Sequence, residues 1–183
     1  LTAHFIKRAD KGKDDIRFKA LRLKNRKICE ALISLRNSGS KNGRAIVGID
    51  AAASEFDTPP EVFAPVFKRL RENGFQYFTF HAGEDFYHLL GGLRAIYEAI
   101  TFLDLQRGDR IGHATAAGVD PGIWEHNVGC EVVVPIGAYM DDLLFVYYLI
   151  SNNECKALES LMPRLYMRIM ELSREIFPND EFQ

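Results

Sequence analysis

The chain has 183 residues, 47% of them hydrophobic and 26% charged, a composition that supports a substantial buried core in one domain. No run of about 18 apolar residues predicts a membrane span. The net charge is −2, but residues 1–44 hold 13 Lys/Arg against 4 Asp/Glu. Because this basic segment lacks interleaved aromatic residues that would stack on bases, it indicates the solvated face of a helix rather than a nucleic-acid site.

The first strand is expected over residues 1–6, an apolar run that opens the chain without a methionine and suggests a piece of a longer protein. A helix should follow, capped by Asp14 or Asp15, because apolar residues recur at helical spacing between Leu21 and Leu35. Residues 45–50 form a continuous apolar run, typical of a strand in a parallel sheet that is covered on both faces.

The next helix is expected to start at Thr58-Pro59-Pro60-Glu61, with Thr58 as the cap and Glu61 closing a capping box. A strand over residues 75–80 and a helix over residues 89–103 follow. Residues 110–113 then predict a short strand.

Three predicted strands end on ionisable residues, namely Asp50, His81 and His113. The spacing of 31 to 32 residues, with a helix in each interval, predicts repeated β-α units and therefore a parallel sheet. The chemistry of α/β barrels lies at the carboxyl ends of such strands. By itself, His81 could equally be a hydrogen-bonded histidine at a strand end, with Glu84 and Asp85 as acids that favour a helix start.

The regular alternation of predicted strands and helices ends after His113. We expect a short helix or turn at residues 124–129, a strand over residues 131–134, and helices at 138–150 and 154–177. Pro163 should mark a kink or a new helix start. The three cysteines (Cys29, Cys130 and Cys155) are widely spaced and form no CxxC pair, which indicates reduced thiols in a cytoplasmic protein.

The residue types at the strand ends suit metal-assisted hydrolysis. A histidine binds zinc through its neutral imidazole, and a carboxylic acid held protonated can donate to a substrate nitrogen. A second histidine can take a proton from water.

At these residues the sequence resembles the adenosine deaminase family of zinc-dependent amidohydrolases. The family's HAGE stands here as His81–Glu84, its RIGH as Arg110–His113, and its D-x-A-G-x-E has a counterpart in residues 50–55. The resemblance covers residues 1 to about 118. It implies an incomplete (β/α)8 TIM barrel, about strands 3–6, with a helical C-terminal part at residues 119–183 that is an extension or an insertion. The amino-acid sequence around His4–Lys7 and Gly83–Phe86 resembles large bacterial deaminase-like proteins, including those of phage defence, more closely than it resembles the short enzymes of the family.

The resemblance also implies roles. His81 would be a zinc ligand, Glu84 the acid that protonates purine N1, and His113 the group that orients and deprotonates the zinc-bound water. Asp50 and Ala53 would belong to the substrate-binding segment. Ala53 stands where the family usually has a glycine whose N–H meets purine N3, and Ala114 likewise replaces a common glycine.

The family's other zinc ligands, a His-x-His pair and an Asp pair at a strand end, have no clear counterpart. Neither His4 nor His88 forms such a histidine pair, and Asp141-Asp142 precedes a helix-like run. We therefore expect zinc binding to need ligands outside this chain.

Two functions are compatible with these residues. The first is a fragment of a purine deaminase, acting on adenosine or an adenine nucleotide and inactive without the rest of its barrel. The alternative is a catalytically inactive interaction or assembly module derived from such a barrel. In either case the exposed edges of a partial barrel predict an oligomer.

Overall fold

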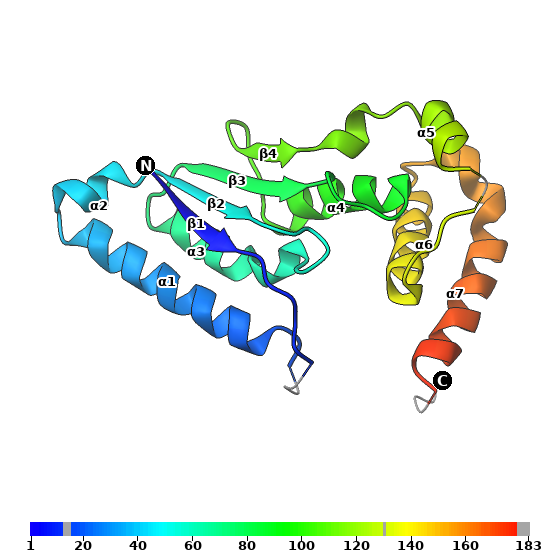
Figure 1. Ribbon diagram of the computed structural model, residues 1–183, viewed down its shortest axis with the longest axis horizontal. Coiled ribbons are helices and arrows are strands. Elements are labelled where there is room, and N and C mark those ends of the chain that lie inside the picture. The colour runs from blue at the N-terminus through cyan, green and yellow to red at the C-terminus, as the bar shows by residue number, and fades with distance from the viewer. Residues whose placement is uncertain (13–15, 130, 179–183) are drawn as a thin grey trace. The chain divides into compact units, whose positions relative to one another are not determined.

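The computed structural model describes residues 1–12, 16–129 and 131–178 (Figure 1). It contains two compact units, Leu1–Asp120 and Pro121–Gln183. Among the helices in these ranges, none is both long and apolar enough to cross a membrane.

The first unit is built on a four-stranded sheet. Its strands are β1 (Thr2–Ile6), β2 (Gly48–Ala52), β3 (Tyr77–Ala82) and β4 (Arg110–His113). They pair in the order β1-β2-β3-β4, and each pair is parallel. The predicted α/β class with a parallel sheet is confirmed.

Helices connect these strands, as parallel pairing requires. Between β1 and β2 lie α1 (Lys19–Asn37) and α2 (Lys41–Ala45). A 3-10 turn at Pro60–Val62 and α3 (Ala64–Glu72) lead to β3, and α4 (Leu89–Phe102) leads to β4. A further 3-10 turn, Thr115–Gly118, follows β4.

The sheet buries one face and leaves functional groups on the other, because side chains alternate along a strand. Phe5, Ile49, Phe78 and Phe80 are almost fully buried. They belong to a core shared with α1 and α3, which lie along one side of the sheet in Figure 1. The aromatic rings interlock: the Phe67 ring lies 5.3 Å from that of Phe78.

The start of α3 differs from the expectation. Thr58 does not cap the helix, and the 3-10 turn that precedes α3 has no side-chain cap. Instead, Thr58 Oγ1 accepts a hydrogen bond from Arg8 N and donates one to Arg8 O, each 2.8 Å long. The capping-box prediction was wrong because a tertiary contact between the loops after β1 and β2 takes the hydroxyl.

The start of α1 rests on a different residue from those expected. Asp14 and Asp15 lie outside the described residues. The residue before the helix, Phe18, has a φ of 59° and no side-chain cap. Its backbone N–H donates to Asp10 Oδ2 at 2.8 Å, so a carboxylate before the loop fixes the entry to the helix.

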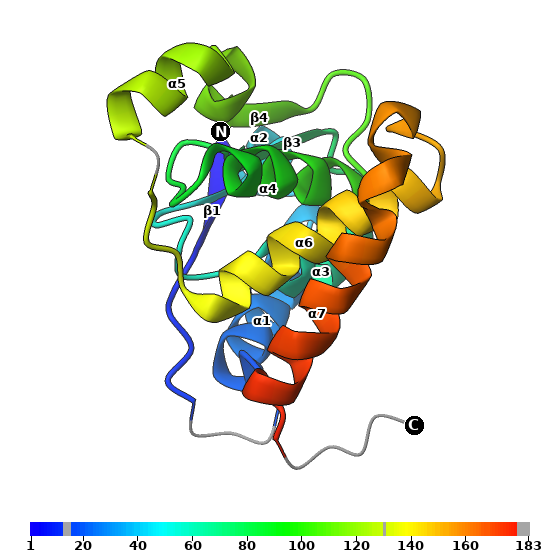
Figure 2. The same cartoon turned by 90° about the vertical axis from the view of Figure 1, so that its right-hand side faces the viewer.

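The second unit is helical. It contains α5 (Pro121–Val128), α6 (Ile136–Ser151), a 3-10 segment at Lys156–Leu161 and α7 (Met162–Ile176). In Figure 2, α6 and α7 pack side by side. Pro163 lies in the first turn of α7, so it marks a new helix start, where its missing N–H costs nothing.

The strand predicted over residues 131–134 was wrong. Residues 131–135 are neither helix nor strand, and Val133 is 93% exposed. An apolar run becomes a strand only when another backbone lies beside it to pair, and nothing in the described part of the chain pairs with this one. The role of residues 119–183 as an extension or insertion stays a prediction.

Candidate active site

The parallel sheet brings polar side chains together toward the carboxyl ends of its strands. Asp50 lies in the middle of β2, His81 is the penultimate residue of β3, and His113 is the last residue of β4. β2 extends two residues beyond the predicted end at Asp50, and β3 extends one residue beyond His81. In the register of the sheet, His4 on β1 pairs with Asp50, and His81 pairs with Gly112.

In one half of the site, the buried Asp50 contacts two histidines. Its side chain is 8% exposed, its Oδ2 lies 2.8 Å from His4 Nδ1, and its Oδ1 lies 3.5 Å from His81 Nε2. This Oδ1 has no hydrogen-bond partner among the described residues. In the sequence, His4 stood out only as a histidine of the first strand that forms no His-x-His pair. Its contact with Asp50 depends on the register between β1 and β2, which the sequence does not show.

The other half of the site is an acid and a base in contact. Glu84 Oε2 lies 3.2 Å from His113 Nε2, and both side chains are 48% exposed. The His113 ring is also 5.1 Å from the His81 ring. The structure therefore brings together Glu84, His113 and His81, and it joins Asp50 to His81.

Two backbone features shape this half of the site. A Cβ at Gly112 would lie 2.5 Å from His81 Nδ1, so the His81 imidazole occupies the space above that glycine. His113 has a φ of 62°, and Ala114 after it has a φ of 50°. The chain therefore turns sharply at the end of β4, in a conformation that side chains disfavour.

Ala53 lies apart from these contacts, exposed in the turn after β2. Its φ is 93°, a backbone conformation that glycine adopts freely and alanine does not. The strain explains physically why a glycine would suit this position. Whether the Ala53 N–H meets a purine stays a prediction.

Two residues without a predicted role hold the turn that carries Glu84. Glu55 Oε2 accepts hydrogen bonds from Glu84 N at 3.0 Å and Asp85 N at 3.4 Å. Lys7 Nζ donates to His81 O at 2.5 Å and lies 4.3 Å from the centre of the Phe80 ring. Spacing within the segment 50–55 could have pointed to Glu55, and a lysine near the end of an apolar strand could have pointed to Lys7.

Lys7 is only 3% exposed. Burial lowers the pKa of its ammonium from 10.5 to about 8, because the charged form loses its hydration. The carboxylates of Glu55, Asp50 and Asp85 act in the opposite direction and keep the pKa from falling further.

The described residues do not make a zinc site by themselves. Within them, no group of three or more His, Cys, Asp or Glu side chains is arranged to hold a metal ion. Asp141 and Asp142 lie in α6 rather than at the end of a strand. His88 caps α4, with its Nδ1 accepting from Leu90 N at 3.1 Å.

Comparisons with known proteins agree with the resemblance. The adenosine deaminase family profile matches residues 15–135. An adenine deaminase of Psychrobacter cryohalolentis is 39% identical over 64 residues, which are 35% of this chain and 18% of that protein. An adenine deaminase of Albidiferax ferrireducens is 41% identical over 76 residues, which are 42% of this chain and 19% of that protein.

The aligned stretch thus spans about a fifth of the length of these two relatives. The family profile, in contrast, covers well over half of this chain and contains all three motifs. The chain therefore belongs to the adenosine deaminase family, and its parallel β/α units are part of that family's (β/α)8 barrel.

Proposed function

We propose that the protein is a hydrolase that replaces the amino group of a purine with oxygen from water and releases ammonia. The observation that carries the proposal is the contact of 3.2 Å between Glu84 and His113, beside His81 at the carboxyl edge of a parallel sheet. Membership of the adenosine deaminase family supports it. The predicted substrate is adenosine or an adenine nucleotide, and the names of the two relatives add free adenine to the candidates.

In this proposal the two contacting groups share the proton transfers. Glu84 donates a proton to the purine ring nitrogen next to the reacting carbon, and His113 orients the attacking water and accepts its proton. Asp50 and the N–H of Ala53 belong to the substrate-binding segment. His81 is proposed as one zinc ligand, and the remaining ligands have to come from outside this chain.

The test is an ammonia-release assay on the full-length protein with adenine, adenosine, AMP and ATP. Glu84→Gln and His113→Ala should each lower the rate by about 10²- to 10⁴-fold, the usual contribution of a general acid or base. His126→Ala is a matched control, because it removes an exposed histidine of α5 and should leave the rate unchanged.

Metal analysis of the same preparation separates the two candidate functions. A zinc-containing protein that deaminates one of the four compounds supports the hydrolase. A full-length protein that is metal-free and releases no ammonia would refute it and favour the inactive interaction module. The cytoplasm stays the proposed location, since Cys29 and Cys155 are free thiols; Cys130 lies outside the described residues.

A further inference from the structure

The turn from His81 to Asp85 is held by hydrogen bonds from three other segments. At its start, the His81 carbonyl accepts from Lys7 Nζ of the β1 segment at 2.5 Å. In its middle, the Gly83 carbonyl accepts from Ala116 N at 2.8 Å. At its end, the N–H groups of Glu84 and Asp85 donate to Glu55 Oε2.

We propose that Glu55 is a positioning residue, which fixes the backbone of Glu84 so that its carboxyl group stays against His113. Glu55 touches neither substrate nor reacting atoms in this proposal. The effect of Glu55 on catalysis rests on the proposed function, whereas its hold on the Glu84 backbone does not.

The chemistry of Glu55 fits this role. One carboxylate oxygen accepts two successive backbone N–H groups, an arrangement that binds anions well and that a neutral side chain reproduces less strongly. The other oxygen, Oε1, is buried and has no hydrogen-bond partner among the described residues. A buried polar atom without a partner costs free energy, which the two backbone hydrogen bonds to Oε2 have to offset.

Glu84 needs such support because its own side chain is loosely held. It is about half exposed, and the side chain it contacts is a histidine that is exposed to the same extent. Its position therefore depends on the backbone from which it projects. A shift of about 1 Å in a catalytic group can lower a rate by about 100-fold, so a turn fixed from several sides preorganises the pair.

Lys7 adds a contact at the start of the turn. Its ammonium is buried on the Phe80 ring and holds the His81 carbonyl. It also interacts electrostatically with Glu55. A buried cation thus holds the start of the turn and a partly buried anion its end, and the two belong to neighbouring strand-loop segments.

The first test measures hydrogen–deuterium exchange in the full-length protein and needs no activity. In Glu55→Ala the amides of Glu84 and Asp85 should exchange about tenfold faster, as expected for the loss of a charged hydrogen bond. In Glu55→Gln the exchange should rise less than in Glu55→Ala, because the amide oxygen can still accept but carries no charge. Asp57→Ala, which removes a neighbouring carboxylate and keeps the backbone hydrogen bond from Asp57 N to Ser54 O, is the control and should leave both amides unchanged.

The second test is kinetic. Glu55→Ala should lower kcat by about tenfold or more while KM stays within about twofold, and Glu55→Gln should recover most of kcat. Unchanged exchange at Glu84 and Asp85 in Glu55→Ala would overturn the proposal, and so would exchange that rises equally throughout β2 and β3. If the wild-type protein deaminates no purine, the proposed function fails, and the exchange measurement still decides whether Glu55 holds the turn.

Discussion

The absence of a side chain at Gly112 gives the His81 imidazole its place. A Cβ there would lie 2.5 Å from one ring nitrogen and 2.7 Å from two ring carbons, so Gly112→Ala must displace the ring. We expect ammonia release by the full-length protein to fall by about tenfold or more, because the ring leaves the position beside His113. Gly118→Ala is the control, since nothing lies within 4 Å of its added Cβ. Equal rates for the two variants would contradict this explanation of the RIGH glycine.

At Ala53 a side chain is present although the backbone conformation favours glycine. At a φ of 93°, a residue with a Cβ costs about 1–2 kcal/mol, whereas glycine adds about 0.4–1 kcal/mol of unfolded-state entropy. Ala53→Gly should therefore raise the free energy of unfolding by up to about 1 kcal/mol in urea denaturation. Ala52→Gly, within β2, should lower it by about 0.5–1 kcal/mol. Destabilisation by both variants would show that the turn relaxes in solution.

Asp10 should make the free energy of unfolding depend on pH, with a smaller stabilisation at low pH. Hydrogen bonds from backbone N–H groups, first of all that of Phe18, lower the pKa of Asp10 below its ordinary 3.8. Because the folded state binds this proton less readily than the unfolded state, the stabilisation is complete above about pH 4 and is lost as the pH falls through the folded pKa. Asp10→Asn should thus be less stable than the wild type at about pH 7, with the difference shrinking near pH 3. Denaturation curves at both values check this, and a difference that does not change with pH would exclude the charge of Asp10 as its source.

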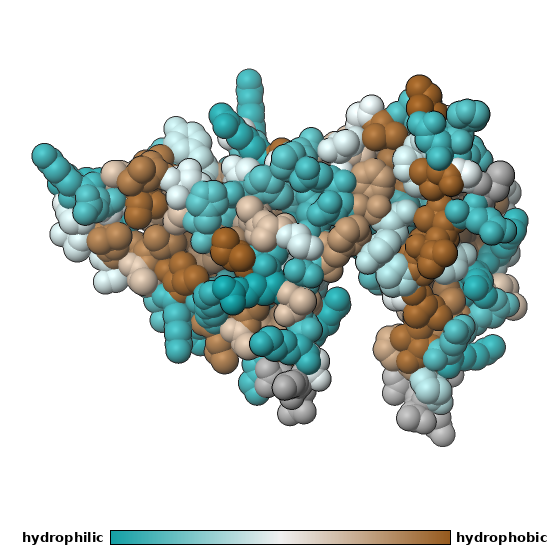
Figure 3. All heavy atoms as spheres, in the orientation of Figure 1, coloured by the Kyte–Doolittle hydropathy of each residue, from teal (hydrophilic) through white to brown (hydrophobic). Residues whose placement is uncertain are grey.

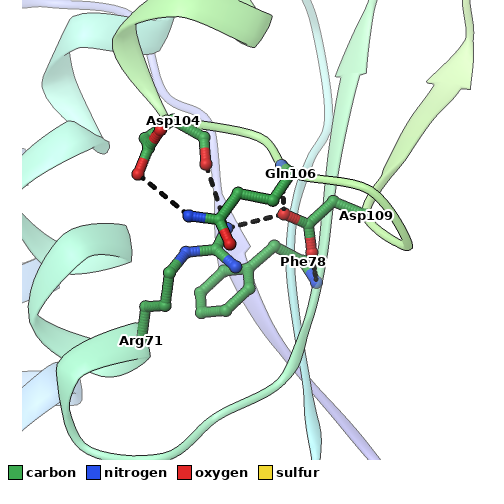
Figure 4. Close-up of polar contacts among 5 residues, drawn as sticks. All are labelled: Arg71, Phe78, Asp104, Gln106 and Asp109. Carbon is green, nitrogen blue, oxygen red and sulfur yellow. Dashed lines mark hydrogen bonds and ion pairs between the residues drawn. The ribbon is translucent and has the colours of Figure 1, made fainter.

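At the scale of elements, Asp109 ties three segments together, as Figure 4 shows. Its Oδ2 accepts from Arg71 Nη2 of α3 at 2.6 Å and from Gln106 N at 2.8 Å, and its Oδ1 accepts from Phe78 N of β3 at 3.0 Å. The carboxylate is 3% exposed. It therefore fixes the turn before β4 against the amino end of β3, and with it the register that brings His113 to the site.

Removing this carboxylate should be costly. Asp109→Ala leaves two backbone N–H groups without their acceptor and the Arg71 guanidinium with only the Asp104 carbonyl at 3.3 Å among the described residues, and we expect the free energy of unfolding to fall by about 3 kcal/mol. Glu30→Ala is the matched comparison, because it breaks an Arg26–Glu30 pair of 3.0 Å that is largely exposed. It should cost less than about 0.5 kcal/mol. Similar losses for the two variants in urea denaturation would refute the role of burial.

The elements also show what a sequence can and cannot predict. The parallel strands that carry Asp50, His81 and His113 were predictable, because apolar runs separated by helices report a parallel sheet without knowledge of tertiary contacts. Their carboxyl ends were predictable only to within two residues, and His113 alone is the last residue of its strand. The partners of Thr58, His4 and Glu55 were not, since each depends on a neighbouring segment: Arg8, Asp50 and the Glu84 backbone. The strand predicted at residues 131–134 failed for the same reason, because pairing is a property of two segments.

At the scale of the whole molecule, the sheet ends at β1 and β4, each of which pairs with one strand within the described residues. The edge beside β1 also exposes apolar side chains, with Leu1 78% and Ile6 43% exposed. In Figure 3, apolar surface gathers on the second unit as well, where Leu158, Leu161 and Met167 are exposed. Unpaired backbone groups along a strand edge and apolar patches of this kind favour association.

We therefore expect the 183-residue chain, expressed alone, to associate with copies of itself. Light scattering coupled to size-exclusion chromatography, at several concentrations, should give a mass above the 20.8 kDa of one chain. Adding a segment that supplies strands to the β1 and β4 edges should return the chain to a defined complex, because pairing satisfies the edges that drive association. A chain that stays a compact monomer at every concentration would show that its edges are already protected, and would count against an open half-barrel as the form that exists in solution.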